Sequence, residues 1–315
     1  MFFRFLTILL PRATVADINR NMAENLRYCG PALIANETTL HNVIQMITDI
    51  INKQHPSQIE FGEDEVAPEE TSEFDWVVID TALDVVSGMA AALGQSFAEL
   101  WKVFEKTVLR YASSSESLER ATAVGVLAEC INGMGGAVTK FSPAFLKLLV
   151  HRLGDEDPQA KSNAAYAVGR LVEHSNDAGI VNEFPTILSK LENCLQMDVS
   201  RLQDNATGCL SRMILRHREN VPIKDVLPVL VNILPLKNDF EENDPLYRMI
   251  CQLCMFFILT LPRNGILTDL LQTNGRTLPS GNSLLSSCLS SRPFSVTRMP
   301  WRMSAALSSP SLSSG

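Results

Sequence analysis

The sequence predicts an all-α protein, an α-solenoid of stacked antiparallel helix pairs. Three segments resemble one another: 118–129 (LERATAVGVLAE), 162–173 (SNAAYAVGRLVE) and 204–215 (DNATGCLSRMIL). They place Glu119, Asn163 and Asn205 at matching positions, spaced 44 and 42 residues apart. Apolar residues recur at helical spacing, and Gly, Asp and Pro mark the turns between helices. Self-similarity at this period is typical of a helical repeat array, which usually serves as a surface for binding other macromolecules.

Residues 1–56 are predicted to be helical and to contain partial repeats. The opening MFFRFLTILLPRA resembles a leader peptide, but the apolar run is short and contains Arg4, which favours the first turns of a helix. Residues 38–53 carry apolar residues at helical spacing, and Thr38 or Thr39 is a candidate cap.

Residues 57–73 are predicted to form an acidic loop. No Lys or Arg occurs between Lys53 and Lys102. The segment 57–100 carries a net charge of −11, whereas the whole chain carries −8. Two interpretations stay open: a solvated linker, and a flexible anionic segment that attracts a basic partner over about one Debye length, roughly 8 Å.

Residues 74–255 are predicted to form the repeat array. Phe74–Leu93 and residues 96–112 have the pattern of apolar helices, the first ending at Gly94. Residues 142–174 form the clearest unit, with Ser142 as a candidate cap, a GDEDP turn, and a second helix rich in small residues that allow close approach. Units at 182–217 and 222–254 repeat this plan, which is the HEAT pattern.

Residues 256–315 are predicted to be a disordered tail. Residues 280–315 contain 13 serines and no usable periodicity. A regulatory tail and an altered reading frame are both compatible with this composition, and we favour the second. The array is then cut in mid-repeat near Cys254, which exposes an apolar face that a capping repeat normally covers.

Five segments carry a resemblance to a known family: NMAENLRYCGPALI (21–34), EFDWVVIDTALDVVSGMAAALG (73–94), SNAAYAVGRLVEH (162–174), RLQDNATGCLSRMI (201–214) and LPLKNDFEEND (234–244). They resemble the importin-β (karyopherin-β) family, and within it the importin-4 type. The resemblance covers roughly residues 20–254. This segment resembles a carboxy-terminal part of a full receptor. The tail is unrelated to the family.

The resemblance implies a nuclear import receptor that shuttles between cytoplasm and nucleus. It implies basic protein cargo such as histones or ribosomal proteins, and phenylalanine–glycine repeats of nucleoporins as partners. It does not extend to the amino-terminal repeats with which the family binds Ran, so Ran binding is not expected of this chain. The alternative is a HEAT scaffold that assembles a complex without shuttling; a truncated product that does not transport is a further possibility.

Ten residues are candidate cargo-binding residues on charge and position. The acidic interval supplies Glu60, Glu63, Asp64, Glu65, Glu69 and Glu70, and the second helices of the repeats supply Asn163, Tyr166, Asp204 and Asn205. The alternative role for the second-helix residues is hydrogen bonding between repeats or simple solvation, and for any one residue we favour it.

No catalytic centre, cofactor site or metal site is expected. The five histidines are isolated, and Cys251-Gln-Leu-Cys254 lacks a second pair of ligands, so we interpret the cysteines as buried reduced thiols of a cytosolic or nuclear protein. An acidic chain has no electrostatic reason to bind nucleic acid. No uninterrupted apolar run approaches the roughly 20 residues that span a bilayer.

Overall fold

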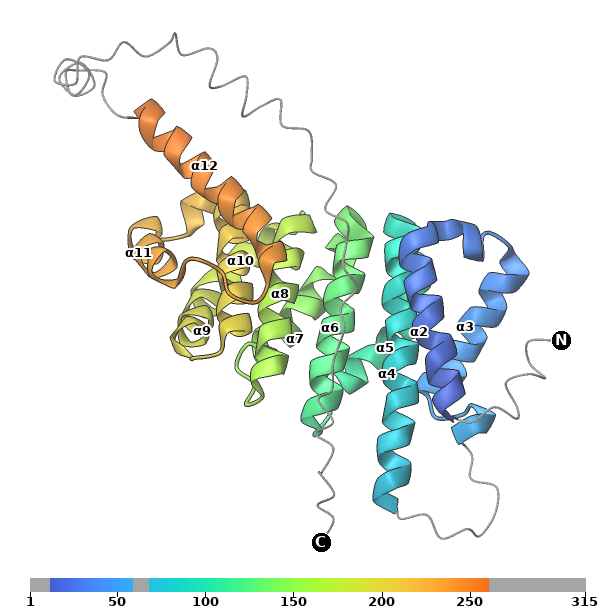
Figure 1. Cartoon of the computed structure of the whole chain (residues 1–315). Helices are drawn as coiled ribbons and strands as arrows, with labels where there is room; N and C mark the ends of the chain where they lie inside the picture. The colour runs from blue at the N-terminus through green and yellow to red at the C-terminus, as the bar shows by residue number, and fades with distance from the viewer. Residues whose placement is uncertain (1–11, 59–67, 261–315) are drawn as a thin grey trace, which may run out of the picture. The chain divides into compact units, whose positions relative to one another are not determined.

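The computed structural model describes residues 12–58 and 68–260, and within these ranges all regular structure is helical (Figure 1). The α-helices are α2 (Arg12–Cys29), α3 (Glu37–Ile51), α4 (Pro68–Leu93), α5 (Phe97–Tyr111), α6 (Ser117–Met134), α7 (Ser142–Arg152), α8 (Pro158–His174), α9 (Phe184–Gln196), α10 (Ser200–His217), α11 (Ile223–Ile233) and α12 (Asn243–Thr260). Short 3-10 helices join several of them, including η4 (Gly135–Phe141), η5 (Ala178–Glu183) and η7 (Phe240–Glu242). One compact unit extends to Phe256.

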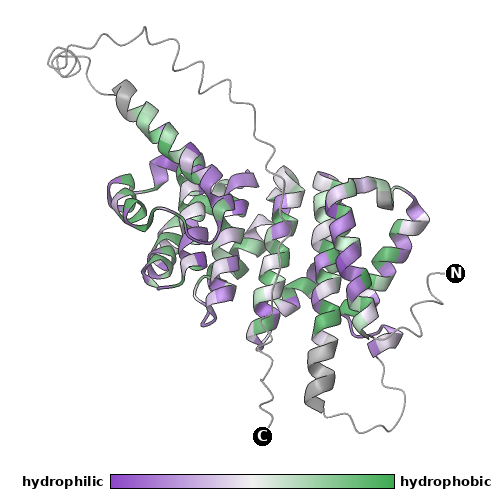
Figure 2. Cartoon of the chain, viewed as in Figure 1, coloured by the Kyte–Doolittle hydropathy of each residue, from purple (hydrophilic) through white to green (hydrophobic). Residues whose placement is uncertain are grey.

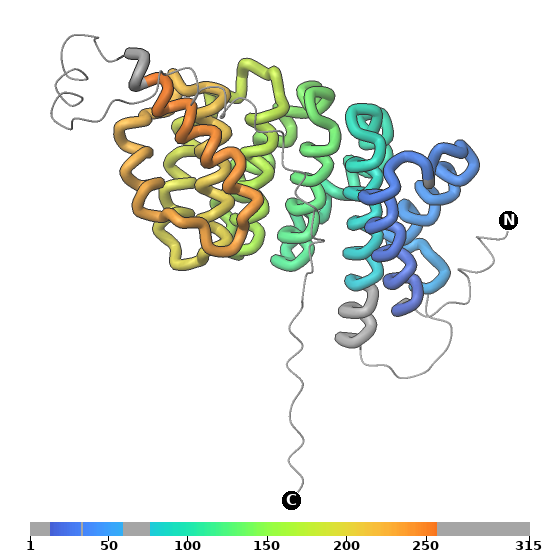
Figure 3. Tube along the Cα trace, turned by 45° about the horizontal axis from the view of Figure 1, so that its top comes forward, coloured from blue at the N-terminus to red at the C-terminus, as the bar shows by residue number. Residues whose placement is uncertain are grey.

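The helices of this unit form two layers. The even-numbered helices α2, α4, α6, α8 and α10 pack on one another in chain order and make the most extensive contacts in the fold. The odd-numbered helices α3, α5, α7, α9 and α11 precede α4, α6, α8, α10 and α12 in the pairs, and Figure 3 shows the pairs following one another along the chain. This arrangement confirms the predicted all-α solenoid of stacked helix pairs.

Small residues let the even-numbered helices approach closely. A Cβ added at Gly133 of α6 would lie 2.5 Å from the Ala90 carbonyl oxygen of α4. A Cβ added at Gly169 of α8 would lie 3.0 Å from the Cα of Cys209 in α10. Glycine is therefore required at both positions for backbone contact, as the small residues of 162–173 predict.

The core lies between the two layers. Figure 2 shows that most helices carry both hydrophobic and hydrophilic residues, as expected for helices that bury one side. Trp101 of α5 is fully buried and packs edge-on against Phe145 of α7, with ring centroids 5.5 Å apart. An aromatic contact between successive pairs of this kind contributes about 1 kcal/mol beyond the area it buries.

Helix starts differ from the sequence predictions at two positions. Asn36, rather than Thr38 or Thr39, caps α3, and its side chain accepts a hydrogen bond from the Thr39 N–H. Ser142 is the first residue of α7 and does not cap it, because its hydroxyl is buried and bonds Ser175 Oγ and the Val138 carbonyl. Asp157 caps α8, with Pro158 at the first position as predicted.

Two segment boundaries also shift. Helix α4 begins at Pro68, so residues 68–73, predicted as part of the acidic loop, are helical. Proline is favoured at the first position of a helix, and Glu69 and Glu70 follow in the turn where the helix dipole favours carboxylates. Helix α12 continues to Thr260, past the predicted boundary at 256. The predicted leader-like start, most of the acidic loop, and the serine-rich tail after 260 lie outside the described residues.

Candidate functional site

Hydrogen bonds with a spacing close to the repeat length connect α6, α8 and α10 each to the even-numbered helix before it. Thr122 of α6 donates to Asp80 of α4 at 3.1 Å. Asn163 of α8 donates to the Ala121 carbonyl of α6 at 2.8 Å, and Asn205 of α10 donates to Ser162 of α8 at 2.9 Å. Two of the three matched positions, Asn163 and Asn205, therefore hold successive repeats in register, whereas no such bond to another described residue is seen for Glu119.

Three of the candidate cargo residues are consequently buried, which corrects the prediction that they contact cargo. Asn163 is 6% exposed, and Asp204 and Asn205 are 1% exposed. The Asp204 carboxylate accepts hydrogen bonds from the backbone N–H groups of Lys237, Asn238 and Asp239 at 3.0, 2.6 and 2.9 Å. It holds the loop between α11 and α12 against α10 and does not face a partner.

Tyr166 is the fourth candidate on these helices, and it is partly exposed on α8. The guanidinium groups of Arg170 and Arg212 lie 5.1 and 5.8 Å from the centroid of its ring. Burial, together with the charge of Glu129, raises the pKa of Tyr166 above its usual range. The phenol is thus neutral and is held against two cations, with part of its edge open to solvent.

Arg212 is the centre of a buried ion-pair cluster. It is 2% exposed, and it bonds both carboxylate oxygens of Glu242, which is fully buried, and Glu173 Oε2 at 3.0 Å. Arg170 bonds the same Glu173 oxygen at 3.0 Å. Sequence analysis did not identify Glu242, although it lies in the LPLKNDFEEND segment; its partner is 30 residues away and only the tertiary structure brings the two together.

A pair of carboxylates on α4 was also missed. Asp80 and Asp84 lie one turn apart, and burial, with the charge of Asp84, raises the pKa of Asp80 to about 6. Burial raises the pKa of Asp84 as well, against the effect of Arg27, whose guanidinium lies 3.6 Å away. Arg27 pairs with Asp84 alone; among the described residues Asp80 has no ion pair and accepts a hydrogen bond from Thr122, and Arg20 acts on both carboxylates more weakly. A further cation would therefore stabilise the ionised form of both. Two Asp residues at helical spacing in the apolar stretch 76–93 were the available signal.

The acidic interval is only partly covered by the structure. Glu60, Glu63, Asp64 and Glu65 lie outside the described residues. Glu69 and Glu70 belong to the start of α4, but their side chains are outside the described part. Their proposed role in attracting cargo therefore stays a prediction.

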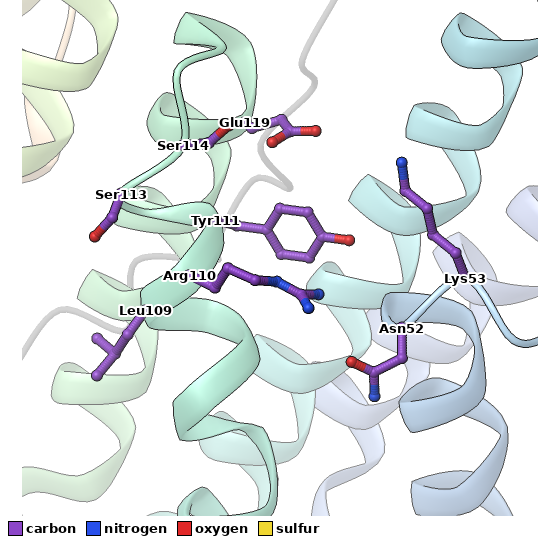
Figure 4. Close-up of a pocket in the computed structure, with 8 residues that line it drawn as sticks. All are labelled: Asn52, Lys53, Leu109, Arg110, Tyr111, Ser113, Ser114 and Glu119. Atoms are coloured by element: carbon purple, nitrogen blue, oxygen red, sulfur yellow. The ribbon is translucent and has the colours of Figure 1, made fainter.

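The odd-numbered helices border two cavities. One, of about 740 Å³, lies where α3 and α5 end and is lined by residues such as Lys53, Arg110 and Tyr111 (Figure 4). The other, of about 550 Å³, lies between α7 and η5. Pro143, Leu146 and Val150 form the apolar part of the second cavity, and Asp177 and Glu183 form its acidic part.

The described residues contain no group of three His, Cys, Asp or Glu side chains that could hold a metal ion. Cys130, Cys194 and Cys209 are buried thiols as expected, but Cys29, Cys251 and Cys254 are exposed, which corrects the prediction for those three. The stretches 76–111 and 117–152 are long and apolar enough to cross a membrane by composition alone. In each, 61% of the most apolar window is buried against other helices, as in the core of a helical stack.

Comparisons with known proteins agree with this architecture. No family model matches the chain. It is 37% identical over 219 residues to the probable importin subunit beta-4 of Schizosaccharomyces pombe, covering 66% of this chain and 20% of that protein. It is 30% identical over 234 residues to importin-4 of Homo sapiens, covering 73% and 22%. The chain thus spans about a fifth of the length of these relatives.

Solved structures show the same fold. The karyopherin Kap121p bound to the SUMO protease Ulp1p superposes with a TM-score of 0.60 at 12% identity, over 78% of this chain and 23% of that one. Kap121p bound to Ste12p gives a TM-score of 0.56 at 14% identity, over 74% and 22%.

Proposed function

We propose that this chain, which belongs to the importin-β family and matches its importin-4 type, forms the part of a nuclear import receptor that holds a basic protein cargo. The observation that carries the proposal is the similarity to two importins over most of the described residues. We further propose that the cargo is a lysine- and arginine-rich protein such as a histone or a ribosomal protein, and that the chain moves between cytoplasm and nucleus with it.

Charge supports a basic cargo. Asp84 pairs with Arg27, whereas Asp80 has no ion pair in the described part of the chain. The acidic interval precedes both on the same helix and on the segment before it. A cargo lysine beside Asp80 and Asp84 would lower the pKa of both carboxylates and gain a charge-assisted hydrogen bond. The interval from Glu60 to Glu70 would act mainly on the rate of encounter, because electrostatic steering speeds association more than it sets affinity.

The first experiment measures binding of a labelled histone-tail peptide to the full chain by fluorescence anisotropy. The double variant Asp80→Asn/Asp84→Asn should bind at least about fivefold more weakly, which corresponds to about 1 kcal/mol for loss of a partly exposed ion pair. Asp198→Asn, at an exposed position in the turn between α9 and α10, is the matched control and should leave affinity unchanged. Equal binding by all three proteins would refute the role of Asp80 and Asp84.

The second experiment addresses the acidic interval. Replacing Glu63, Asp64, Glu65, Glu69 and Glu70 with Gln or Asn should slow capture of the same peptide at low salt by up to about tenfold, with a smaller effect on the dissociation rate. Raising the salt concentration should remove the difference between the proteins. An unchanged association rate at low salt would reduce the interval to a linker.

The third experiment separates a transport receptor from a scaffold that does not shuttle. A receptor should bind a phenylalanine–glycine repeat peptide, and the cavity between α7 and η5 offers an apolar site for it. Val150→Ser should weaken that binding, whereas Val103→Ser, on the exposed face of α5, should not. A chain that binds neither the repeat peptide nor the histone tail is not a receptor segment.

A further inference from the structure

A second charged site lies mainly on odd-numbered helices, whereas Asp80 and Asp84 lie on the even-numbered helix α4. The cavity of about 740 Å³ is formed by the end of α3, the end of α5 and the beginning of α6. This volume is within the range of sites that bind small molecules or a few peptide side chains. Its walls include Asn52, Lys53, Leu109, Arg110, Tyr111 and Glu119.

The backbone holds the cavity in a defined shape. The Tyr111 hydroxyl donates to the Ile51 carbonyl at 2.8 Å, which fixes the end of α5 to the end of α3. Lys53 has φ 59°, the left-handed region that only a few side chains tolerate, and its N–H bonds the Ile50 carbonyl. Figure 4 shows the Arg110 and Tyr111 side chains directed from α5 toward the Asn52–Lys53 end of α3.

Two cations of the cavity are not neutralised by the described part of the chain. No ion pair there involves Lys53 or Arg110, whereas Lys102 and Lys140, also outside the even-numbered layer, both bond Glu99 at 2.6 Å. The Arg110 guanidinium lies 5.1 Å from the Tyr111 ring centroid, a contact that orients it and leaves its N–H groups available. Glu119 is the one carboxylate among the described residues that line the cavity.

The dipoles of α3 and α5 favour basic residues near the C-terminal ends of these helices, but they do not neutralise the charges of Lys53 and Arg110. The last carbonyls of α3 and α5 already accept backbone N–H bonds, from Asn52 and Lys53 and from Ala112, Ser113 and Ser114. The hydroxyl groups of Ser113 and Ser114 add donors to the cavity wall. Two cations with hydroxyl donors beside them can bind a carboxylate on an extended peptide segment.

We propose that this cavity binds an acidic peptide segment of a partner protein, with one carboxylate between Lys53 and Arg110. The Ser113 and Ser114 hydroxyls bond the peptide backbone, and Leu109 contacts an apolar side chain. This site differs from the proposed cargo site in its helix layer and in the sign of the charge it selects. It allows a second, acidic protein to bind while the even-numbered helices hold a basic one.

The test uses the full chain and a fluorescein-labelled peptide of alternating Glu and Ser, with a Gln–Ser peptide as its uncharged counterpart. At about 50 mM salt, where surface charges are weakly screened, the Glu peptide should bind and the Gln peptide should not. Lys53→Asn and Arg110→Gln should each weaken binding about threefold to fivefold. Asn tolerates the left-handed conformation of residue 53, so the first variant keeps the backbone intact.

Lys106→Gln is the matched control, because Lys106 is exposed on α5 one turn before Arg110 and does not line the cavity. It should leave the affinity for the Glu peptide unchanged, and histone-tail binding should be the same in all of these variants. The proposal is overturned if the Glu peptide does not bind, if the Gln peptide binds as well, or if Lys106→Gln weakens binding as much as the cavity variants do.

Discussion

The contact between Gly208 and Glu242 makes a sharp prediction about stability. An added Cβ at Gly208 of α10 would overlap the Glu242 carboxylate and lie 2.9 Å from its Cγ. Glu242 is fully buried and held by Arg212, so it has no free space into which to move. We therefore expect Gly208→Ala to expel the carboxylate from Arg212.

The magnitude follows from two opposing terms. Replacing Gly with Ala inside a helix stabilises it by about 1 kcal/mol. Breaking a buried ion pair costs about 3–5 kcal/mol, and the low end applies because Arg212 keeps Glu173 at 3.0 Å. Gly208→Ala should therefore destabilise the chain by about 2 kcal/mol, although Gly→Ala in a helix is ordinarily favourable.

Urea unfolding followed by circular dichroism measures the net effect, and hydrogen exchange at Lys237, Asn238 and Asp239 measures the loop directly. Gly136→Ala is the control, because an added Cβ there meets no atom within 4 Å. On a Glu242→Ala background, Gly208→Ala should cost nothing, since the carboxylate is gone; the two changes should couple by about 2 kcal/mol or more. The reasoning fails if Gly208→Ala is as stable as the parent chain and its loop exchanges at the same rate.

Two further predictions concern buried polar groups. Burial and the charge of Glu242 raise the pKa of Asp239 from 3.8 to about 6, so ionisation of this carboxyl opposes folding as the pH rises through that interval. Asp239→Asn should therefore add about 1–2 kcal/mol to the free energy of unfolding at pH 7 and little at pH 4. Burial lowers the pKa values of buried His55 and partly buried His174, which have the opposite pH dependence. The quantity to measure is therefore the difference in urea midpoint between variant and parent at each pH, and a constant difference would contradict the assignment. Asn163→Ala removes the bond to the Ala121 carbonyl and should cost about 1 kcal/mol while histone-tail binding is unchanged, with exposed Asn182→Ala as the control. A loss of peptide binding without loss of stability would return Asn163 to the list of cargo residues.

Local sequence signals were sufficient for most of the helix pairs. The turn at Asp157-Pro158 and the end of α4 before Gly94 follow from capping and glycine chemistry, which act within a few residues. The cap of α3 was misplaced because Asn36 and two threonines compete for the same role within one turn. Ser142 has the residue type of a cap but is used to bond Ser175, 33 residues later, and no local pattern reports such a partner.

The candidate site was less predictable than the fold, because exposure depends on which neighbour covers a residue. Asn163 and Asn205 look like free polar side chains of a helix, yet each is directed at the preceding helix of the stack. Asp80 and Asp84 look like two isolated acids, yet both are partly buried, with Asp80 bonded to Thr122 and Asp84 beside Arg27. Cys251 and Cys254 follow an apolar pattern, yet they lie on an exposed face of α12.

By itself the sequence determined the helices, their pairing and the repeat length, because helix periodicity, caps and turns are set by residues close together in the chain. The tertiary structure decided which polar residues bond between repeats and which face solvent, since these partners lie about 42 residues apart or, as with Arg212 and Glu242, in a different kind of element. A repeat period predicts that two positions are neighbours; only the packing of the helices decides which atoms meet there.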